Sequence, residues 1–304
     1  MPAERRNKKQ QENRGDAAAP QRLAVRKTYK LYVNGAFPRS ESGRSYPVTS
    51  AKGEHLANAA LASRKDARDA VVAARKAFGG WAGRTAYNRG QVLYRAAEML
   101  EGRRAQFVDE VVAADGVGRG RAEALVSAAI DRWVYYAGWT DKIAQVAGAA
   151  NPVSGPYFNQ SAPEPAGVVA VIAPPWAPLL GLVSVVAPVI ATGNTAVVVA
   201  GERAPLPAVT LGEVLATSDL PGGVVNILTG RLAELAPPLA AHADVNALDL
   251  TGAGDLAAEL EEAAADTLKR VLRPEPAPDW SADPGTIRMT PFLETKTVWH
   301  PIGV

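Results

Sequence analysis

The chain has 304 residues, is 47% hydrophobic and contains only 6% aromatic residues, which suffices for one large domain or two modest ones. Its formal net charge of +2 gives no basis for a polyanionic partner, so we expect no nucleic-acid partner. The absence of cysteine excludes disulfides, thiolate metal ligands and a cysteine nucleophile from this sequence.

The N-terminus is basic. Residues 1–30 hold nine Lys or Arg and three acidic residues with little apolar content, a pattern typical of a disordered tail. A nucleic-acid or membrane arm is one alternative, but no aromatic residues interleave with the charges, so a solubilising extension is favoured. No signal peptide is expected, and the longest apolar stretch, Leu179–Ala191, is too short to cross a bilayer. These features predict a cytoplasmic protein without a membrane partner.

The first half of the folded region predicts helices. Leu31–Gly35 predicts a strand that runs into an Asn-Gly turn. Helical spacing of apolar residues then predicts a helix, a helical pair broken near Gly102, and a third helix that carries an aromatic stripe expected in the core. The three helical regions are Ser63–Phe78, Asn88–Ala114 and Ala122–Val146, and the stripe is Trp133, Tyr136 and Trp139. Pro152–Pro163, rich in Pro, Gly, Ser and Asn, predicts an exposed hairpin or connection.

The second half alternates between aliphatic strands and helices. Four such repeats indicate βαβ units and a parallel sheet, so the predicted fold class is α/β with a Rossmann-like cofactor domain preceded by helices. The predicted strands are Val168–Ile172, Thr195–Ala200, Val224–Leu228 and Ala247–Leu250; the helices are Leu179–Ala191, Leu206–Thr217, Leu232–Ala241 and Leu256–Ala265.

A Pro-rich segment follows. Residues 271–289 cannot form a helix or a central strand, which predicts a linker. Residues 290–304 alternate in a way that predicts a terminal strand, and such a strand needs a sheet to join.

Candidate ligand-binding residues follow the predicted parallel strands, because such folds bind ligands at the carboxyl ends of their strands. Thr251 and Gly252 belong to a Thr-Gly-Ala-Gly turn that could admit a phosphate at a helix N-terminus, although many plain strand-to-helix turns have this composition. Glu202 could hydrogen-bond a ribose or be an ordinary surface carboxylate. Gly230 follows the third strand and completes the candidate set for nucleotide binding.

The sequence gives little support for a metal site or for a catalytic residue. His55, His242 and His300 show no metal-ligand spacing, so no metal site is expected. The Pro-rich loop Ala173–Pro178 offers no general base or nucleophile. No nucleophile elbow and no Walker motif occurs in the sequence, so no catalytic residue is assigned.

Six segments follow the pattern of one known family: Leu31–Gly35, Pro165–Ile172, Ala187–Thr195, Pro221–Gly230, Leu250–Gly252 and Phe292–Trp299. Together they resemble the aldehyde dehydrogenase superfamily over about Lys30–Val304. The resemblance implies that residues 31–270 form an NAD-binding-fold domain of this family, whose NAD(P)-dependent members use a thiolate, a nicotinamide and a Glu to oxidise aldehydes.

The sequence departs from the family pattern at its chemical positions. Trp176 stands in the place of the oxyanion-hole Asn, Val199 in the place of a ribose-binding Lys, and Ala253 in the place of a Ser at the pyrophosphate. The catalytic domain, on the order of 150 residues, is replaced by the linker. The resemblance therefore implies a vestigial cofactor site at Glu202, Gly230, Thr251 and Gly252, with NAD bound weakly or not at all.

In the family, the counterparts of the hairpin at 152–163 and of the final strand form a small sheet that bridges subunits. Retention of both predicts a non-catalytic subunit that assembles with itself or with a full-length aldehyde dehydrogenase through Pro152–Pro163 and Thr290–Val304. Two alternatives stay open. The chain could be a required subunit of an NAD-dependent aldehyde dehydrogenase hetero-oligomer, or a degenerate nucleotide-binding sensor.

Overall fold

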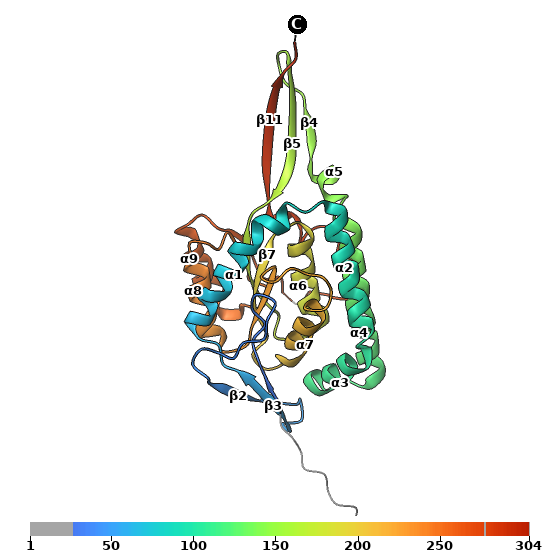
Figure 1. The fold of residues 1–304 in the computed structure, drawn as a ribbon, viewed down its shortest axis with the longest axis vertical. Coiled ribbons are helices and arrows are strands. Elements are labelled where there is room, and N and C mark those ends of the chain that lie inside the picture. The colour runs from blue at the N-terminus through green and yellow to red at the C-terminus, as the bar shows by residue number, and fades with distance from the viewer. Residues whose placement is uncertain (1–26, 277, 304) are drawn as a thin grey trace, which may run out of the picture.

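The body of the molecule is a five-stranded parallel sheet with helices on both faces (Figure 1). The computed structural model describes residues 27–276 and 278–303. The strand order is β10-β9-β6-β7-β8, and all the pairings are parallel. This confirms the predicted α/β class. The strands are β6 (Val168–Ile172), β7 (Thr195–Val199), β8 (Val225–Leu228), β9 (Ala247–Asp249) and β10 (Arg270–Leu272).

Aliphatic residues fill both faces of the sheet. In β6, Val169 and Val171 belong to one hydrophobic cluster, while Val168, Ala170 and Ile172 belong to another on the opposite face. A strand alternates its side chains between faces, so a strand that is covered on both sides must be apolar throughout. For this reason the parallel strands were recognisable as continuous aliphatic runs.

Two groups of helices cover the two faces. One group packs with the cluster that contains Val169, and the other packs with the cluster that contains Val168. The first group is α2 (Ala86–Glu101), α3 (Arg104–Asp115), α4 (Arg119–Trp139), α6 (Leu180–Ala191) and α7 (Leu206–Leu215); the second is α1 (Arg64–Ala82), α8 (Leu232–Ala241) and α9 (Ala257–Ala265). Figure 1 shows α8 and α9 on one side of the sheet and α6, α7, α2 and α4 on the other.

Local sequence explains the ends and faces of the helices. Ser63 caps α1 in a capping box with Asp66, whose side chain accepts in return from the Ser63 backbone N–H. In α4 the buried residues recur at spacings of three and four. Trp133 and Tyr136 are fully buried, as predicted for the stripe, whereas its third member, Trp139, is only partly buried against the same cluster. The short helix α5 (Ile143–Ala147) follows after a turn, so the predicted helix 122–146 is in fact two helices.

A small sheet at the N-terminal end was not predicted. It contains β1 (Thr28–Tyr29), β2 (Ser45–Thr49) and β3 (His55–Ala60) in the order β1-β3-β2. Regular structure in the described residues therefore begins at Thr28 rather than at Leu31, because β1 pairs with β3. The predicted tail over residues 1–26 lies outside the described residues. The predicted strand Leu31–Gly35 forms only isolated bridges, although its Asn34-Gly35 turn has the expected positive φ angles.

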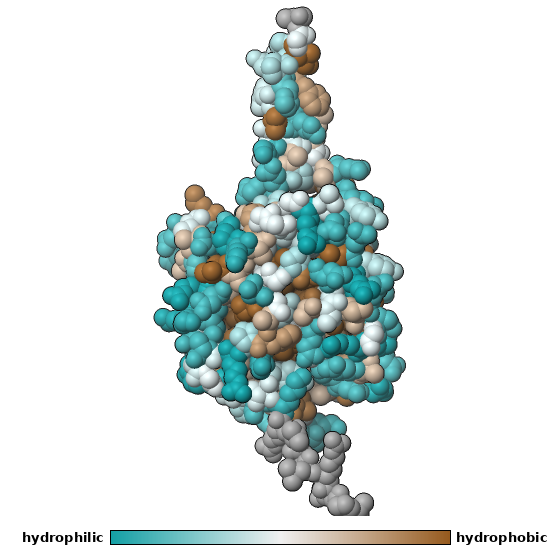
Figure 2. All heavy atoms as spheres, viewed as in Figure 1, coloured by the Kyte–Doolittle hydropathy of each residue, from teal (hydrophilic) through white to brown (hydrophobic). Residues whose placement is uncertain are grey.

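A three-stranded antiparallel sheet projects from the other end of the body, and we call it the blade (Figure 1). It contains β4 (Ala149–Asn151), β5 (Tyr157–Pro165) and β11 (Leu293–Pro301), with β5 in the centre. The predicted hairpin and final strand are both present and pair along nine residues. Exposed apolar side chains on the blade are Tyr157, Phe158, Val298, Trp299 and Ile302, and Figure 2 shows brown patches on this projection.

The segment predicted as a linker folds back on the body. Its first two residues belong to β10, an edge strand of the central sheet, and Met289 at its other end is fully buried. Trp280 is also buried. The described residues 273–276 and 278–289 therefore belong to a covering loop, which is followed by a short 3₁₀ helix, Thr290–Phe292, before β11. No helix within residues 27–276 and 278–303 is both long and apolar enough to span a membrane.

Candidate functional site

The candidate residues lie at the carboxyl edge of the central sheet, as predicted. Gly252 follows β9 and donates its backbone N–H to Ile172 O of β6, at 2.9 Å. A Cβ at Gly252 would stand 2.0 Å from Ala173 O, so only glycine permits this approach of the two loops. Glu202 follows β7 on the other side of β6, which separates it from Gly252 by two strand spacings, roughly 10 Å.

The carboxylate of Glu202 already contacts neighbouring groups of the protein. Its carboxylate forms an ion pair with Arg231, and Oε2 accepts from the backbone N–H of Leu232 at 3.4 Å, at the start of α8. An acidic group at a helix N-terminus is favourable because of the helix dipole. The same pairing raises the pKa of Arg231. Glu202 therefore contacts the N-terminal end of α8, and these contacts occupy its carboxylate.

Gly230 has a structural role as well. Its φ of 154° lies in the region that favours glycine, and a Cβ there would stand 3.2 Å from Ala62 N and Leu235 Cδ1. Gly230 lets the loop after β8 pass between α8 and the segment that precedes α1. Gly230 and Glu202 are brought near each other through the adjacent Arg231.

Thr251 is buried and its hydroxyl is fully engaged. The Thr251 hydroxyl donates to Asp249 Oδ1 and accepts from Arg288 Nη1, at 2.9 Å for the second contact. Asp249 is completely buried, and burial raises the pKa of its carboxyl, opposed by Arg288 with Nη1 3.4 Å from Oδ2. A ligand at this turn would compete with a buried ion pair for the hydroxyl.

Arg288 comes from the covering loop, and no sequence pattern singled it out. Its guanidinium lies over the Trp280 ring, 5.0 Å from the centroid, and its side chain is only 8% exposed. Arg132 of α4 holds the same loop by donating to the carbonyls of Trp280 and Ala282, at 2.7 and 3.2 Å. The loop is thus fixed to the sheet edge and to α4 by two buried arginines.

The loop after β6 is the remaining part of this edge. Trp176 is 45% exposed, and Ala177 has a φ of 54°, a left-handed conformation that costs an alanine roughly 1–2 kcal/mol. A Cβ at Gly181, in the first turn of α6, would meet Pro174 Cγ at 2.7 Å. The prolines and the close contact shape a rigid loop that presents an indole ring, with no carboxylate, hydroxyl or amide side chain.

The histidines do not form a metal site. His55 and His300 are exposed, and His242 Nδ1 accepts from the Asp244 backbone N–H at 3.1 Å. In the described parts of the chain no three His, Cys, Asp or Glu side chains gather as metal ligands would.

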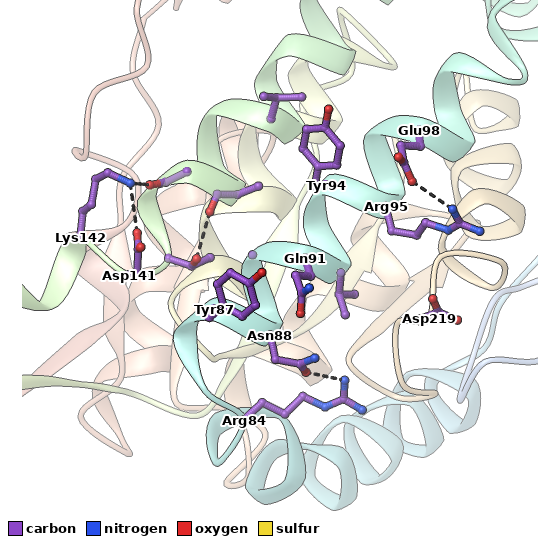
Figure 3. A pocket seen from close by; sticks show the side chains of 16 residues that line it. Arg84, Tyr87, Asn88, Gln91, Tyr94, Arg95, Glu98, Asp141, Lys142 and Asp219 are labelled. Atoms are coloured by element: carbon purple, nitrogen blue, oxygen red, sulfur yellow. Dashed lines mark hydrogen bonds and ion pairs between the residues drawn. The ribbon is translucent and has the colours of Figure 1, made fainter.

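A large groove lies away from the sheet edge, between α2 and α4 (Figure 3). Its volume is about 730 Å³, and Tyr87 and Tyr94 stand in it. Most of its charged side chains are satisfied by neighbours: Arg95 pairs with Glu98 at 3.0 Å and Lys142 with Asp141 at 3.1 Å. None of the four predicted cofactor residues lines it.

This architecture can be compared with known proteins. The family described as "Aldehyde dehydrogenase family" matches residues 37–273, more than half of the chain. The chain belongs to the aldehyde dehydrogenase family. This membership confirms the resemblance found in the sequence.

Relatives in the family are longer than this chain. A putative aldehyde dehydrogenase, DhaS, of Bacillus subtilis is 34% identical over 252 residues, which cover 80% of this chain and 50% of DhaS. Human retinal dehydrogenase 2 is 34% identical over 250 residues, or 80% of this chain and 47% of the relative. The chain thus spans about half the length of these relatives.

Solved structures give the same result. An NAD+ complex of an aldehyde dehydrogenase from Bacillus cereus superposes with a TM-score of 0.75 and 29% identity, covering 81% of this chain and 50% of the other. HpcC from Thermus thermophilus superposes with a TM-score of 0.75 and 31% identity, covering 81% and 47%. This chain therefore has the fold of about half of each of these two structures.

Proposed function

We propose that this chain is a non-catalytic aldehyde dehydrogenase-like subunit that assembles with itself or with a full-length aldehyde dehydrogenase. The observation that carries the proposal is the blade, which projects from the body with aromatic side chains exposed on it. Tyr157 and Trp299 pack edge-on against each other at 5.7 Å and remain 44% and 56% exposed. Exposed aromatic pairs on an open sheet are typical of association surfaces.

The chemistry of the sheet edge supports a non-catalytic role. The sequence has no cysteine to act as a nucleophile, and a buried Arg288 takes the hydroxyl of Thr251. The residues present fit NAD poorly, since Glu202 is paired with Arg231 and Val199 is a fully packed core residue. We propose that NAD binds weakly or not at all, and calorimetry that gave a micromolar dissociation constant for the full chain would contradict this.

Assembly through the blade is tested by the mass of the particle. Native mass spectrometry or light scattering on the full chain should give a dimer, alone or mixed with a full-length family member. The substitution Trp299→Glu should shift the particle to a monomer. Tyr87→Glu is the matched control, because Tyr87 is an aromatic residue 71% exposed on the body.

The result can also reject the proposal. If the chain stays monomeric at tens of micromolar and forms no complex with a full-length family member, the blade is not an assembly surface. If the purified chain alone reduces NAD in the presence of an aldehyde, the subunit is catalytic. We place the assembly in the cytoplasm, and fractionation of the source cells would check that location.

The alternative of a required subunit gives a different measurement. In that case the turnover of a full-length partner would rise on addition of this chain and would fall with Trp299→Glu. Partner rates that stay equal with and without this chain would leave only the structural role.

A further inference from the structure

A small pocket lies at the C-terminal end of β3, in the three-stranded sheet at the end of the body opposite the blade (Figure 1). Its volume is about 220 Å³. All the charged side chains that line it are basic: Lys30, Arg39 and Arg44. The other lining residues are Thr28, Tyr29, Ser40, Gly43, Ser45 and Ala60. The pocket is therefore polar and positively charged, and none of the four candidate cofactor residues lines it.

The pairing of the strands brings the three basic residues together. Because β1 runs parallel to β3 and β2 runs antiparallel to it, the C-terminal end of β1 and the N-terminal end of β2 both lie beside the C-terminal end of β3. Lys30 directly follows β1, and Arg44 directly precedes β2. Arg39 is held beside Lys30 because the backbone N–H of Leu31 donates to the Pro38 carbonyl at 3.1 Å. Three separate segments thus supply one positive charge each to the same pocket.

The loop that carries both arginines is anchored to α1. Ser40 is buried, and its hydroxyl donates to Asp66 Oδ2 at 2.7 Å. The backbone N–H of Glu41 donates to Asp66 Oδ1 at 3.1 Å, and Glu41 Oε1 accepts from Ser63 Oγ at 3.0 Å. The side chains of Asp66 and Glu41 are thus engaged at the start of α1. These bonds give the loop a fixed shape, so a ligand would bind without the entropic cost of ordering the loop.

The basic side chains of the pocket are exposed and carry no counter-charge. Lys30, Arg39 and Arg44 form no ion pair with any of the described residues. Arg44 donates through Nε to Ser42 Oγ at 3.4 Å, which leaves its terminal nitrogens available to a ligand. Like charges that share a small pocket repel one another, and an anion between them would offset that repulsion.

We propose that this pocket binds a small phosphate-bearing anion, with the phosphate oxygens on the guanidinium groups of Arg39 and Arg44 and on the ammonium of Lys30. Arginine can donate two parallel hydrogen bonds to a phosphate, and lysine adds a compact charge. A carboxylate ligand would bring one negative charge to three positive ones, whereas a phosphomonoester brings about 1.5–2 at pH 7. The proposal is independent of the assembly function above, because the blade lies at the other end of the body.

The size and lining of the pocket limit the rest of the ligand. Its volume of about 220 Å³ lies below the range of about 300–1,000 Å³ that is typical of pockets for drug-sized ligands. Its lining contains one aliphatic side chain, Ala60, so a hydrocarbon chain would gain little by entering. We therefore expect a phosphate group on a short polar skeleton, and not a nucleotide or a lipid.

The test is calorimetric titration of the full chain at pH 7.5 with glycerol 3-phosphate and with inorganic phosphate, beside acetate and glycerol as the monoanionic and neutral controls. We expect both phosphates to bind at least tenfold more tightly than acetate, and glycerol to show no binding. Tighter binding of glycerol 3-phosphate than of inorganic phosphate would assign the site to phosphomonoesters. The reverse order would assign it to the free ion, and either order supports the phosphate site.

Single substitutions test the geometry. Arg39→Gln and Arg44→Gln should each weaken phosphate binding at least tenfold. Arg44→Lys keeps the charge but loses the paired hydrogen bonds, so it should weaken binding less than Arg44→Gln does. The matched control is Arg95→Gln, which removes an exposed positive charge from α2, where Arg95 pairs with Glu98 at 3.0 Å, and should leave phosphate binding unchanged. Because all three arginines are exposed, circular dichroism should show folded variants.

Several results would overturn the proposal. The first two are no binding of either phosphate and equal binding of acetate. A weakening in Arg95→Gln as large as that in Arg39→Gln would mean that net charge, and not this pocket, attracts the anion. A single-stranded oligodeoxythymidylate that binds through Arg39 and Arg44, when glycerol 3-phosphate and inorganic phosphate do not bind, would assign the surface to nucleic acid instead.

Discussion

Arg288 joins the covering loop to the buried end of β9. Its guanidinium contacts both Asp249 and Thr251, and all three side chains are almost fully buried. Removal of one member of a buried ion pair leaves the other charge uncompensated, which costs more than the loss of an exposed pair. The stability of the whole sheet edge should therefore depend on this single residue.

We predict that Arg288→Met lowers the free energy of unfolding by about 3 kcal/mol at pH 7.5. Without Arg288 the pKa of Asp249 should rise further, so the native state would bind a proton over a wider pH range than the unfolded state. Stability of the variant should consequently fall as the pH rises, and the loss should be smaller near pH 4.5. Denaturant titration at both pH values measures this. Arg273→Met, an exposed pair with Glu261, should cost under about 0.5 kcal/mol.

Glu110 of α3, whose Oε1 accepts from Thr210 and Gln106, should act in the opposite direction. Burial raises the pKa of its carboxyl above the ordinary value, so the native state prefers the protonated form. The stabilising effect of that proton is present at low pH and is lost as the pH rises through the folded pKa. Glu110→Gln should accordingly raise stability by about 1 kcal/mol at pH 7.5 and have little effect near pH 4. A variant that is less stable at pH 7.5 would contradict this argument.

At the scale of elements, one buried amide connects the blade to the body. Asn194, between α6 and β7, accepts from the Gly167 N–H at 2.8 Å and donates to the carbonyl of Phe292 at 2.9 Å, next to the start of β11. It also donates to Thr192 Oγ1 at 2.8 Å. These three bonds fix the two ends of the blade strands relative to the parallel sheet.

We predict that Asn194→Ala lowers stability by about 2–3 kcal/mol, because it leaves buried partners unsatisfied. Hydrogen exchange should become faster in β5 and β11 than in the parallel strands. Asn151→Ala removes contacts within the blade only, to Asn159 and Ser161, and should speed exchange mainly in β4. Equal acceleration of exchange across the whole molecule in Asn194→Ala would mean that the amide has no local connecting role.

The elements differ in how well their sequences predict them. The parallel strands are buried on both faces and so appear as aliphatic runs, which made β6 and β7 recognisable. The strand β2 is Ser-Tyr-Pro-Val-Thr and β3 carries Asn and Ala, so neither has that pattern. They form by pairing with each other, which is a tertiary effect on segments of weak propensity. The three-residue strand β10, which forms by pairing with β9, was not predicted either.

The candidate residues lie at the carboxyl edge of the sheet, a position that follows from the topology. The hydrogen bonds and ion pairs of the candidate residues could not be predicted from the sequence. Arg288 lies 37 positions from Thr251 in a Pro-rich and Gly-rich segment, and no periodicity places it against β9. Likewise, Glu202 was considered for a ribose, whereas its pairing with Arg231 depends on how α8 begins.

At the scale of the whole molecule, the small N-terminal sheet and the blade occupy opposite ends of a doubly wound body (Figure 1). The proposed assembly surface lies at the end formed by the blade. Between the two ends lies the covering loop, whose residues 278–289 are held by Arg132 and Arg288.

The two borders of the blade differ greatly in length. The nine-residue β11 has one long edge that no other strand of the described residues pairs with, whereas β4 has three residues and is followed by Pro152, which has no N–H to donate. A sheet with one long free edge can pair through that edge with one copy related by a twofold axis. The resulting dimer then offers no second long edge to a third molecule. Under the proposed assembly through the blade, we therefore expect closed dimers rather than fibres.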